Sequence, residues 1–335
     1  MPIRVAINGF GRIGRNVLRA GWDDPEIEFV HLNDLTNDDM LAHLLVNDSV
    51  HGRFDHDVKV VDGGIEIDGK LVRTSAERDP TKLPWGDEKI DVVMECTGVF
   101  RSRDAASKHL QAGAGKVIVS APATDPDATI VVGVNDSTLT GDERIISNAS
   151  CTTNCLAPAA KVIHDRFGIR HGLMTTVHSY TMDQRLLDAP HKDFRRARAA
   201  AVNMVPTTTG AAKAVGLVLP ELAGKLGGMA IRVPTPNVSL VDLVVELDSD
   251  ATVEAVNAAI TEAANGPLKG ILGAESAPLV SSDLVGNPHS SIVDLDLTDM
   301  MGPRTLKILT WYDNEWGFSN RMLDLTRLVM GKNRR

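Results

Sequence analysis

Apolar residues in the first part of the chain follow two alternating patterns. Short runs rich in β-branched residues predict buried strands, at residues 3–8, 27–32, 91–96 and 116–120. Between these runs lie segments with apolar residues at helical spacing, at residues 12–20, 39–46 and 103–112. Strands that alternate with helices of this length predict a mostly parallel, helix-covered sheet, and therefore an α/β domain over residues 1–150.

Residues 58–74 interrupt this alternation. The pairs Asp62-Gly63 and Asp68-Gly69 each stand between alternating apolar residues. Asp-Gly favours the tight two-residue turns that join antiparallel strands. The stretch is therefore expected to insert successive hairpins into the first domain.

The pattern changes after Ser150. Strand-like runs now follow one another with fewer helices between them, at residues 172–177, 230–233, 240–247 and 305–311. Helical spacing occurs at residues 211–219, 253–264 and from residue 315 onward. Such an order predicts an α+β domain with a mainly antiparallel sheet, here residues 151–314.

A glycine motif, GFGRIG at residues 9–14, lies between the first predicted strand and the first predicted helix. Gly9 permits a tight turn, Gly11 lets the backbone approach a pyrophosphate, and Gly14 lets the helix pack against the strand. Asp34 ends the second strand, where a carboxylate accepts hydrogen bonds from a ribose 2′-hydroxyl and repels a 2′-phosphate. The combination predicts a Rossmann-type, doubly wound domain that binds NAD rather than NADP.

The segment SNASCTTNC, at residues 147–155, precedes an apolar helical run. Ser150 is a suitable N-cap, which places Cys151 in the first turn of the helix. The helix dipole and the unpaired amide groups of that turn stabilise a thiolate. Cys151 is thus a candidate nucleophile, with a small buried packing residue as the alternative. Cys155 and Cys96 are expected to be packing residues.

A thiolate nucleophile usually works with a histidine that is distant in sequence. His178 ends an apolar strand-like run and opens the polar segment of residues 179–181. The end of a strand is a suitable place for a catalytic side chain, so His178 is the preferred partner. His191 and His51 remain alternatives at this point.

Composition narrows the class of protein. A chain of 335 residues has the length of two ordinary domains. Its net charge of −9 argues against a protein that binds nucleic acid through bulk electrostatics. No run approaches the roughly 18 uninterrupted apolar residues of a membrane span, and the N-terminus lacks the pattern of a signal peptide. Three cysteines make neither a disulfide framework nor, with their neighbours, a metal site, so a reducing cytoplasmic setting is expected.

Six segments resemble those of phosphorylating glyceraldehyde-3-phosphate dehydrogenases, at residues 8–15, 147–155, 178–181, 206–212, 232–238 and 311–317. The resemblance extends in order over essentially the whole chain. It implies a nucleotide-binding domain of residues 1–150 completed by a helix at residues 315–331, a catalytic domain of residues 151–314, and a homotetramer. It also implies NAD-dependent oxidation of D-glyceraldehyde 3-phosphate, with inorganic phosphate as second substrate, to 1,3-bisphosphoglycerate.

The resemblance assigns roles to individual residues. Cys151 is the nucleophile that forms a hemithioacetal and then a thioester, and His178 is its base. The substrate's phosphate is assigned to Thr181 and Arg232. The attacking phosphate is assigned to Ser150, Thr152, Thr209 and Gly210. Arg196 is selected by its spacing to join these anion-binding residues, with Arg195 and Arg198 as alternatives. NAD is assigned to Gly9, Gly11, Arg12, Ile13, Gly14, Asp34, Arg78, Ser120 and Asn314.

Two positions depart from the family pattern. Phe318 stands where a tyrosine is common, and Ala189 precedes Pro190 where a leucine is common in strictly NAD-linked members. A small residue there leaves room for a 2′-phosphate, so a dual-cofactor variant is one alternative. Erythrose-4-phosphate dehydrogenase, with the same thiol chemistry, is another. A binding protein for RNA or a cell surface is not favoured, since the charge is acidic and every catalytic position is filled.

Overall fold

The computed structural model describes residues 1–331, which form two compact units. Unit 1 consists of Met1–Ile130, Asp136–Ala149 and the described residues from Ser319 onward. Unit 2 consists of Val131–Asn135 and Ser150–Phe318. Within the described residues, no helix is long and apolar enough to cross a membrane.

Unit 1 is built on a nine-stranded sheet with the order β10-β11-β9-β8-β1-β2-β7-β6-β5. The seven strands from β10 to β7 are parallel, as expected from the alternation of strands and helices. They are β1 (Ile3–Asn8), β2 (Ile27–Asn33), β7 (Lys70–Ser75), β8 (Val92–Glu95), β9 (Lys116–Val119), β10 (Ala128–Thr129) and β11 (Ile145–Ser147). Three α-helices connect strands of this sheet: α1 (Arg12–Gly21), α2 (Asp38–Val46) and α3 (Arg103–Gln111).

The predicted hairpins are present at one edge of this sheet. β5 (Val58–Val61), β6 (Gly64–Ile67) and β7 are antiparallel to one another. The turns between them use Gly63 and Gly69, which have φ angles of 82° and 77°. These angles lie in the left-handed region that glycine adopts without steric cost. A short pair, β3 (Asn47–Asp48) and β4 (Gly52–Arg53), and two 3₁₀ helices, Pro80–Lys82 and Asp136–Thr138, complete the regular structure of this unit.

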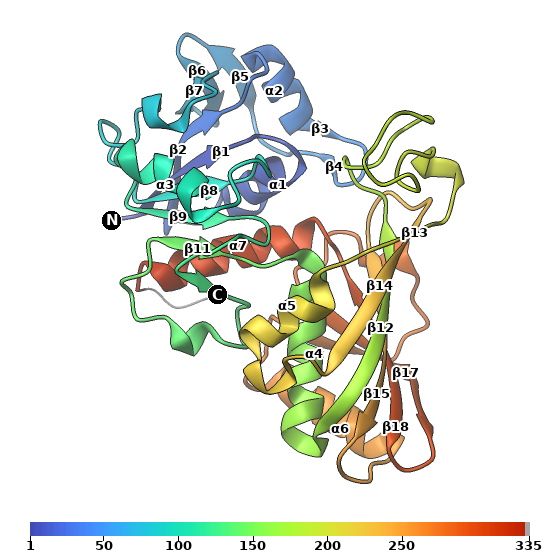
Figure 1. Ribbon diagram of the computed structural model, residues 1–335. Coiled ribbons are helices and arrows are strands. Elements are labelled where there is room, and N and C mark those ends of the chain that lie inside the picture. The colour runs from blue at the N-terminus through green and yellow to red at the C-terminus, as the bar shows by residue number, and fades with distance from the viewer. Residues whose placement is uncertain (332–335) are drawn as a thin grey trace. The chain divides into compact units, whose positions relative to one another are not determined.

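Unit 2 has a seven-stranded sheet with the order β13-β14-β12-β15-β18-β17-β16. Four of its six pairings are antiparallel, which agrees with the expected α+β class. The strands are β12 (Ile169–Ser179), β13 (Val205–Thr207), β14 (Leu226–Val233), β15 (Ser239–Leu247), β16 (Leu272–Glu275), β17 (Ser291–Met301) and β18 (Thr305–Tyr312). The helices α4 (Cys151–Phe167), α5 (Ala211–Val218) and α6 (Val253–Asn265) lie together along one face of the sheet (Figure 1). Three 3₁₀ helices, Ala200–Val202, Pro220–Leu222 and Ser281–Leu284, occur in its loops.

The last helix, α7 (Trp316–Val329), joins unit 1 through its residues from Ser319 onward. Arg327 donates to Asp324 at 2.7 Å and also bonds Asp24, near the other end of the chain. Each of these three side chains is at most 6% exposed. Charges with so little contact with water are retained only when paired and hydrogen-bonded. The pairs therefore fix the helix to residues near the start of the chain.

Removing one member of this buried network is expected to destabilise unit 1 strongly. Arg327→Ala removes the guanidinium that pairs with the buried Asp24, while Asp324 keeps its pair with Arg321, and we expect a loss of about 3–5 kcal/mol in the free energy of unfolding. Urea denaturation followed by far-UV circular dichroism measures this loss. Arg103→Ala is the matched control, because its pairs with Asp125 and Asp127 are exposed to solvent, which screens them, so we expect a much smaller loss. Equal losses in the two variants would contradict a structural role for the Arg327 network.

Candidate active site

The first turn of α4 presents Cys151. The Ser150 hydroxyl accepts a hydrogen bond from the backbone N–H of Thr153 at 3.1 Å, the N-cap expected from the sequence. Cys151 is therefore the first residue of the helix, where amide donors and the helix dipole favour an anion. Ala149, which precedes the N-cap Ser150, has a φ of 55°, which a residue with a side chain adopts rarely. The backbone is thus held in an uncommon conformation two residues before the candidate nucleophile.

His178 lies beside this thiol. Its Nε2 atom is 3.6 Å from the Cys151 Sγ atom, although 27 residues separate the two in sequence. The Nδ1 atom is 2.6 Å from the carbonyl oxygen of Ser179, which can only accept. Nδ1 therefore carries a proton, and the lone pair of Nε2 faces the sulfur. This is the tautomer that a general base requires.

Burial sets the resting protonation of the pair. Burial raises the pKa of Cys151, while the nearby charge of Arg232 opposes this rise. Burial lowers the pKa of His178 to about 3, and the charges of Arg232 and Arg196 act in the same direction. Both groups are therefore neutral near pH 7. The imidazole is ready to accept a proton, and Arg232 is placed to stabilise the thiolate that results.

Arg232 faces the histidine because of strand register. β12 and β14 are parallel neighbours, and their pairing sets His178 opposite Arg232. The guanidinium donates from Nη1 to the Ser179 carbonyl at 3.2 Å and to the Thr181 hydroxyl at 3.0 Å. Arg232 and Thr181, both predicted to bind the substrate's phosphate, are thus direct neighbours beside the thiol–imidazole pair.

The structure distinguishes the three arginines of the 195–198 cluster. Arg196 donates from Nε to the Thr207 hydroxyl at 3.0 Å and from Nη2 to the Thr208 carbonyl at 3.3 Å. Arg195 donates from Nη1 to the Pro206 carbonyl at 3.4 Å, and Arg198 pairs with Asp188 on the surface. Arg196 is the member that lies close enough to influence both His178 and Arg232. Asp183 forms an ion pair with it.

Residues predicted to hold the attacking phosphate occupy two helix starts in unit 2. Thr209 and Gly210 precede α5, and the Thr209 hydroxyl accepts from the Ala211 amide at 3.2 Å. Ser150 and Thr152 lie at the start of α4. The Thr152 hydroxyl is buried and lies 2.9 Å from the hydroxyl of Tyr312. Thr152 can therefore offer an anion its backbone N–H more readily than its side chain.

Sequence reasoning missed several contacts around the pair. The Tyr312 hydroxyl is 2.9 Å from the hydroxyl of Thr176, and its ring meets the His178 ring edge to face. Asn314, predicted to contact NAD, has its Oδ1 fixed by the hydroxyls of Ser179 and Ser239, each at 2.8 Å. This anchoring leaves the amide nitrogen of Asn314 as the group available to a ligand. The sequence signal for these residues is weak, since each partner comes from a different strand.

In unit 1, the glycine motif forms a turn with little space around two of its three glycines. Gly9 has a φ of 94°, and a Cβ atom there would lie 2.6 Å from the Thr97 nitrogen. A Cβ on Gly14 would lie 2.3 Å from the carbonyl oxygen of Gly9. Gly11 is exposed, and nothing lies within 4 Å of the position that its Cβ would take. The turn therefore leaves open backbone at the residue predicted to face the pyrophosphate.

The other predicted NAD residues also lie in unit 1, with the exception of Asn314. The Asp34 carboxylate accepts from the amides of Phe10 at 2.8 Å and Thr36 at 3.1 Å, which ties it to the glycine turn. Arg12 forms an ion pair with the buried Asp48. Arg78 is exposed, and Ser120 follows β9. A turn with open amides at a helix start and an anchored carboxylate after β2 fits a dinucleotide.

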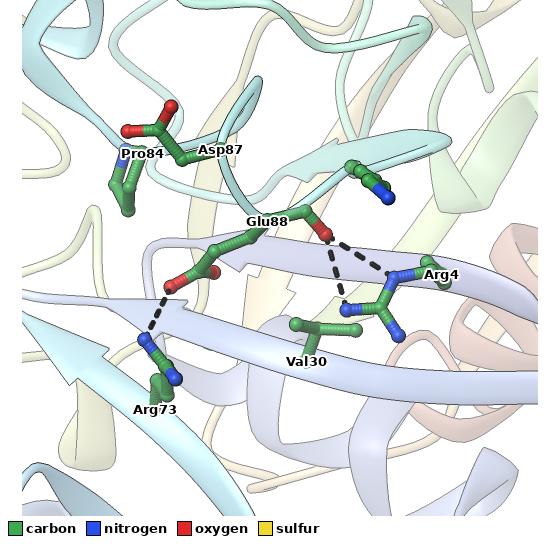
Figure 2. Close-up of a pocket in the computed structure, with 7 residues that line it drawn as sticks. Arg4, Val30, Arg73, Pro84, Asp87 and Glu88 are labelled. Atoms are coloured by element: carbon green, nitrogen blue, oxygen red, sulfur yellow. Dashed lines mark hydrogen bonds and ion pairs between the residues drawn. The ribbon is translucent and has the colours of Figure 1, made fainter.

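A separate pocket of about 600 Å³ lies elsewhere in unit 1 (Figure 2). Its lining contains none of the predicted site residues. Arg4 donates from Nε and Nη2 to the Glu88 carbonyl at 3.2 and 3.1 Å, and Arg73 lies 3.7 Å from the Glu88 carboxylate. Because these guanidinium groups are already engaged, the pocket does not share the chemistry described above. Among residues 1–331, no three His, Cys, Asp or Glu side chains are grouped so that they could hold a metal ion.

A Rossmann-type unit, together with an α+β unit that carries a thiol–imidazole pair, is typical of nucleotide-dependent oxidoreductases. Comparison with known proteins gives the family. Residues 3–103 match the family described as glyceraldehyde 3-phosphate dehydrogenase, NAD binding domain, and residues 150–314 match its C-terminal domain. The chain belongs to the glyceraldehyde-3-phosphate dehydrogenase family.

Curated relatives match over nearly their full length. Glyceraldehyde-3-phosphate dehydrogenase 1 of Bacillus subtilis is 59% identical over 333 residues, which cover 99% of both chains. The glyceraldehyde-3-phosphate dehydrogenase of Geobacillus stearothermophilus is 58% identical with the same coverage. That of Mycolicibacterium smegmatis is 57% identical over 98% of this chain and 99% of the relative.

The lowered pKa of His178 predicts how stability depends on pH. The unfolded chain takes up the histidine proton near pH 6.5, whereas the folded chain does so only near pH 3. Between these values the unfolded state binds one more proton, so stability falls by about 1.4 kcal/mol for each pH unit on acidification. Above pH 6.5 this contribution is constant.

The pH dependence is tested by urea unfolding at several pH values between 4 and 7. His178→Asn is expected to remove this part of the slope. His171→Asn is the control, since that histidine lies on the same strand with an exposed side chain. An unchanged slope in His178→Asn would contradict the assignment of the titration to His178.

Proposed function

We propose that this chain is an NAD-dependent glyceraldehyde-3-phosphate dehydrogenase that uses Cys151 as nucleophile and His178 as base. It converts D-glyceraldehyde 3-phosphate and inorganic phosphate to 1,3-bisphosphoglycerate. The observation that carries this proposal is the 3.6 Å contact between the thiol and an imidazole of fixed tautomer, at the start of a helix. Relatives of that name, which match nearly the whole chain, support it. Neither they nor the family match points to erythrose 4-phosphate or to a dual-cofactor enzyme.

The first chemical step is attack of the thiol on the aldehyde. His178 Nε2 accepts the proton of Cys151, and the sulfur forms a bond with the aldehyde carbon. The charges of Arg232 and of the α4 start favour the thiolate that attacks. The product is a hemithioacetal whose oxygen takes back a proton from His178.

Oxidation follows, with His178 as base again. The imidazole removes the hydroxyl proton of the hemithioacetal as its carbon loses a hydride and becomes a thioester carbonyl. NAD, when bound, supplies the acceptor for that hydride. Asn314 is assigned to orient the carboxamide of the cofactor, since its Oδ1 is anchored and its amide nitrogen remains for a ligand. Residues 1–150 with the helix at 315–331 form the proposed NAD-binding domain, and residues 151–314 the catalytic domain.

Release of the product requires a second anion. Phosphate attacks the thioester carbon, the carbon–sulfur bond breaks, and Cys151 leaves as a thiolate. Guanidinium groups, hydroxyls and open helix-start amides suit two phosphate groups. We assign the substrate's phosphate to Thr181, Arg196 and Arg232, and the attacking phosphate to Ser150, Thr152, Thr209 and Gly210. NAD is assigned to Gly9, Gly11, Arg12, Ile13, Gly14, Asp34, Arg78, Ser120 and Asn314.

The surface of unit 2 supports assembly into a homotetramer. The segment between β12 and β13, residues 180–204, exposes six large apolar side chains: Met182, Leu186, Leu187, Phe194, Val202 and Met204. Exposed apolar residues gathered in one segment mark a surface that a partner covers. We assign the cytoplasm as the site of action, because a free catalytic thiol and two further unpaired cysteines suit a reducing compartment.

The covalent mechanism makes a prediction for initial rates of NADH formation. Cys151→Ser is expected to lower kcat at least about 10³-fold, because a serine at this position is a far weaker nucleophile than the cysteine. Omission of phosphate from the wild-type assay is expected to limit NADH to a burst of one equivalent per site. The Cys155→Ser variant is the control and is expected to keep its activity, since that thiol is buried and bonded to the Thr310 carbonyl. Sustained turnover without phosphate would contradict the phosphorolysis step.

Assembly is tested by light scattering after size-exclusion chromatography. The wild-type chain is expected to have the mass of four chains. Leu187→Asp and Phe194→Asp, whose side chains are 75% and 87% exposed, are expected to give smaller species with unchanged far-UV circular dichroism. Leu71→Asp is the control, an exposed leucine of unit 1 outside the 180–204 segment. Tetramers in all variants would exclude this segment from the interfaces.

A further inference from the structure

The end of β8 carries a buried carboxylate that the reaction described above does not use. Glu95 has no exposed side-chain surface. Its Oε2 accepts from Asn8 Nδ2 at 2.5 Å and lies 3.1 Å from His109 Nε2. Its Oε1 accepts from the backbone N–H of Thr97 at 2.8 Å and also from the Thr97 hydroxyl. Four donors thus converge on one carboxylate.

The protonation of His109 is fixed by its other neighbour. Trp85 donates from Nε1 to His109 Nδ1 at 3.0 Å, and an indole nitrogen can only donate. Nδ1 therefore carries no proton, so the neutral ring has its proton on Nε2 and donates it to Glu95. This arrangement requires an acceptor at Glu95 Oε2. All four neighbours of the carboxylate are donors, and the site is built for an anion without a cation beside it.

The groups held by Glu95 form the turn predicted to bind the dinucleotide. Asn8 immediately precedes Gly9, and its Oδ1 accepts from Asn33 Nδ2 at 2.7 Å. Asn33 immediately precedes Asp34, and its carbonyl accepts from the Gly9 amide at 2.8 Å. On the other side, the Thr97 nitrogen is the atom nearest to the position of a Cβ on Gly9, at 2.6 Å. Glu95 therefore connects the ends of β1, β2 and β8 around the glycine turn.

We propose that Glu95 is a positioning residue for NAD. It acts through Asn8 and Thr97, which fix the glycine turn and the backbone that leads into Asp34. The proposal rests on the proposed placement of the dinucleotide at this turn. A buried anion held by four donors has one low-energy orientation, so the spacing between the Gly9 turn and Asp34 is set before the cofactor binds. Such preorganisation favours affinity for the cofactor rather than the chemical step.

Glu95→Gln tests the proposal with almost no change in volume. The amide NH₂ group must face either the Thr97 N–H or the N–H groups of Asn8 and His109, so at least one donor meets another donor. We expect the Kd and KM for NAD to rise about tenfold, which equals about 1.4 kcal/mol. The kcat at saturating NAD and the KM for glyceraldehyde 3-phosphate are expected to stay within about twofold. A purely structural role would lower the melting temperature without this division between KM and kcat.

Glu88→Gln is the matched control. Glu88 also belongs to unit 1, is mostly buried, and contacts a histidine, His31 Nδ1, at 2.9 Å. It makes no bond to Asn8 or Thr97, so the Kd for NAD is expected to be unchanged. Thr97→Val provides a second route to the same test, since it removes one donor from Glu95 with a small change in shape. We expect about a threefold rise in Kd, and this variant carries the test if Glu95→Gln does not fold.

Asp34→Ala separates failure of this proposal from failure of the NAD site itself. Weaker NAD binding in Asp34→Ala and in both the Glu95→Gln and Thr97→Val proteins supports the positioning role. Weaker binding in Asp34→Ala alone overturns that role and leaves the NAD site in place. Unchanged binding in Asp34→Ala shows that the dinucleotide does not bind at this turn, and it overturns both. Isothermal titration of the full-length enzyme with NAD gives all of these values.

Discussion

The contact between Cys151 and His178 depends on one constraint, the fixed orientation of a buried imidazole. The Ser179 carbonyl holds the Nδ1 proton, and this leaves the Nε2 lone pair directed at sulfur. The ring cannot turn over without losing that hydrogen bond in a place that water does not reach. Strand pairing then sets Arg232 opposite the same histidine. The remaining parts of the site lie around His178 Nε2, an acceptor whose direction is fixed by the backbone carbonyl of Ser179.

The two units differ in the sign of the charged side chains around their candidate sites. In unit 2 the charges that act on His178, beside the Cys151 sulfur, are positive, because they come from the partly buried Arg232 and Arg196. This polarity suits substrates and intermediates that carry negative charge. In unit 1 the side chains bonded to the glycine turn and its neighbours are acceptors, the buried Glu95 and the partly buried Asp34, and their donors are largely backbone and amide groups. In the proposed placement of NAD, the phosphates of the cofactor would meet the backbone at the helix start, while the two carboxylates are bonded to the turn and its neighbours.

Local signals predicted a large part of this structure. A glycine turn between a strand and a helix, and an N-cap immediately before Cys151, depend on residues close together in the chain. The strand β17 was not predicted, because aspartates at positions 294, 296 and 299 divide its apolar residues and a register shift follows Asp294. Side-chain contacts between strands were not predicted either. No residue near Tyr312 or Asn314 in sequence indicates that a hydroxyl of β12 or β15 bonds to it, because such pairs depend on strand register.

The bond between Asp24 and Arg327 joins residues 303 positions apart. Unit 1 is therefore assembled from both extremes of the polypeptide, whereas almost all of unit 2 is one uninterrupted stretch. During synthesis the residues of unit 1 that leave the ribosome first must wait for the last helix before their buried charges are paired. Unit 2 depends on one nearly continuous stretch, so its strands pair without any residue from the start of the chain. A chain that stops before Arg327 therefore keeps every strand of unit 2, whereas Asp24 of unit 1 lacks the guanidinium that pairs with it.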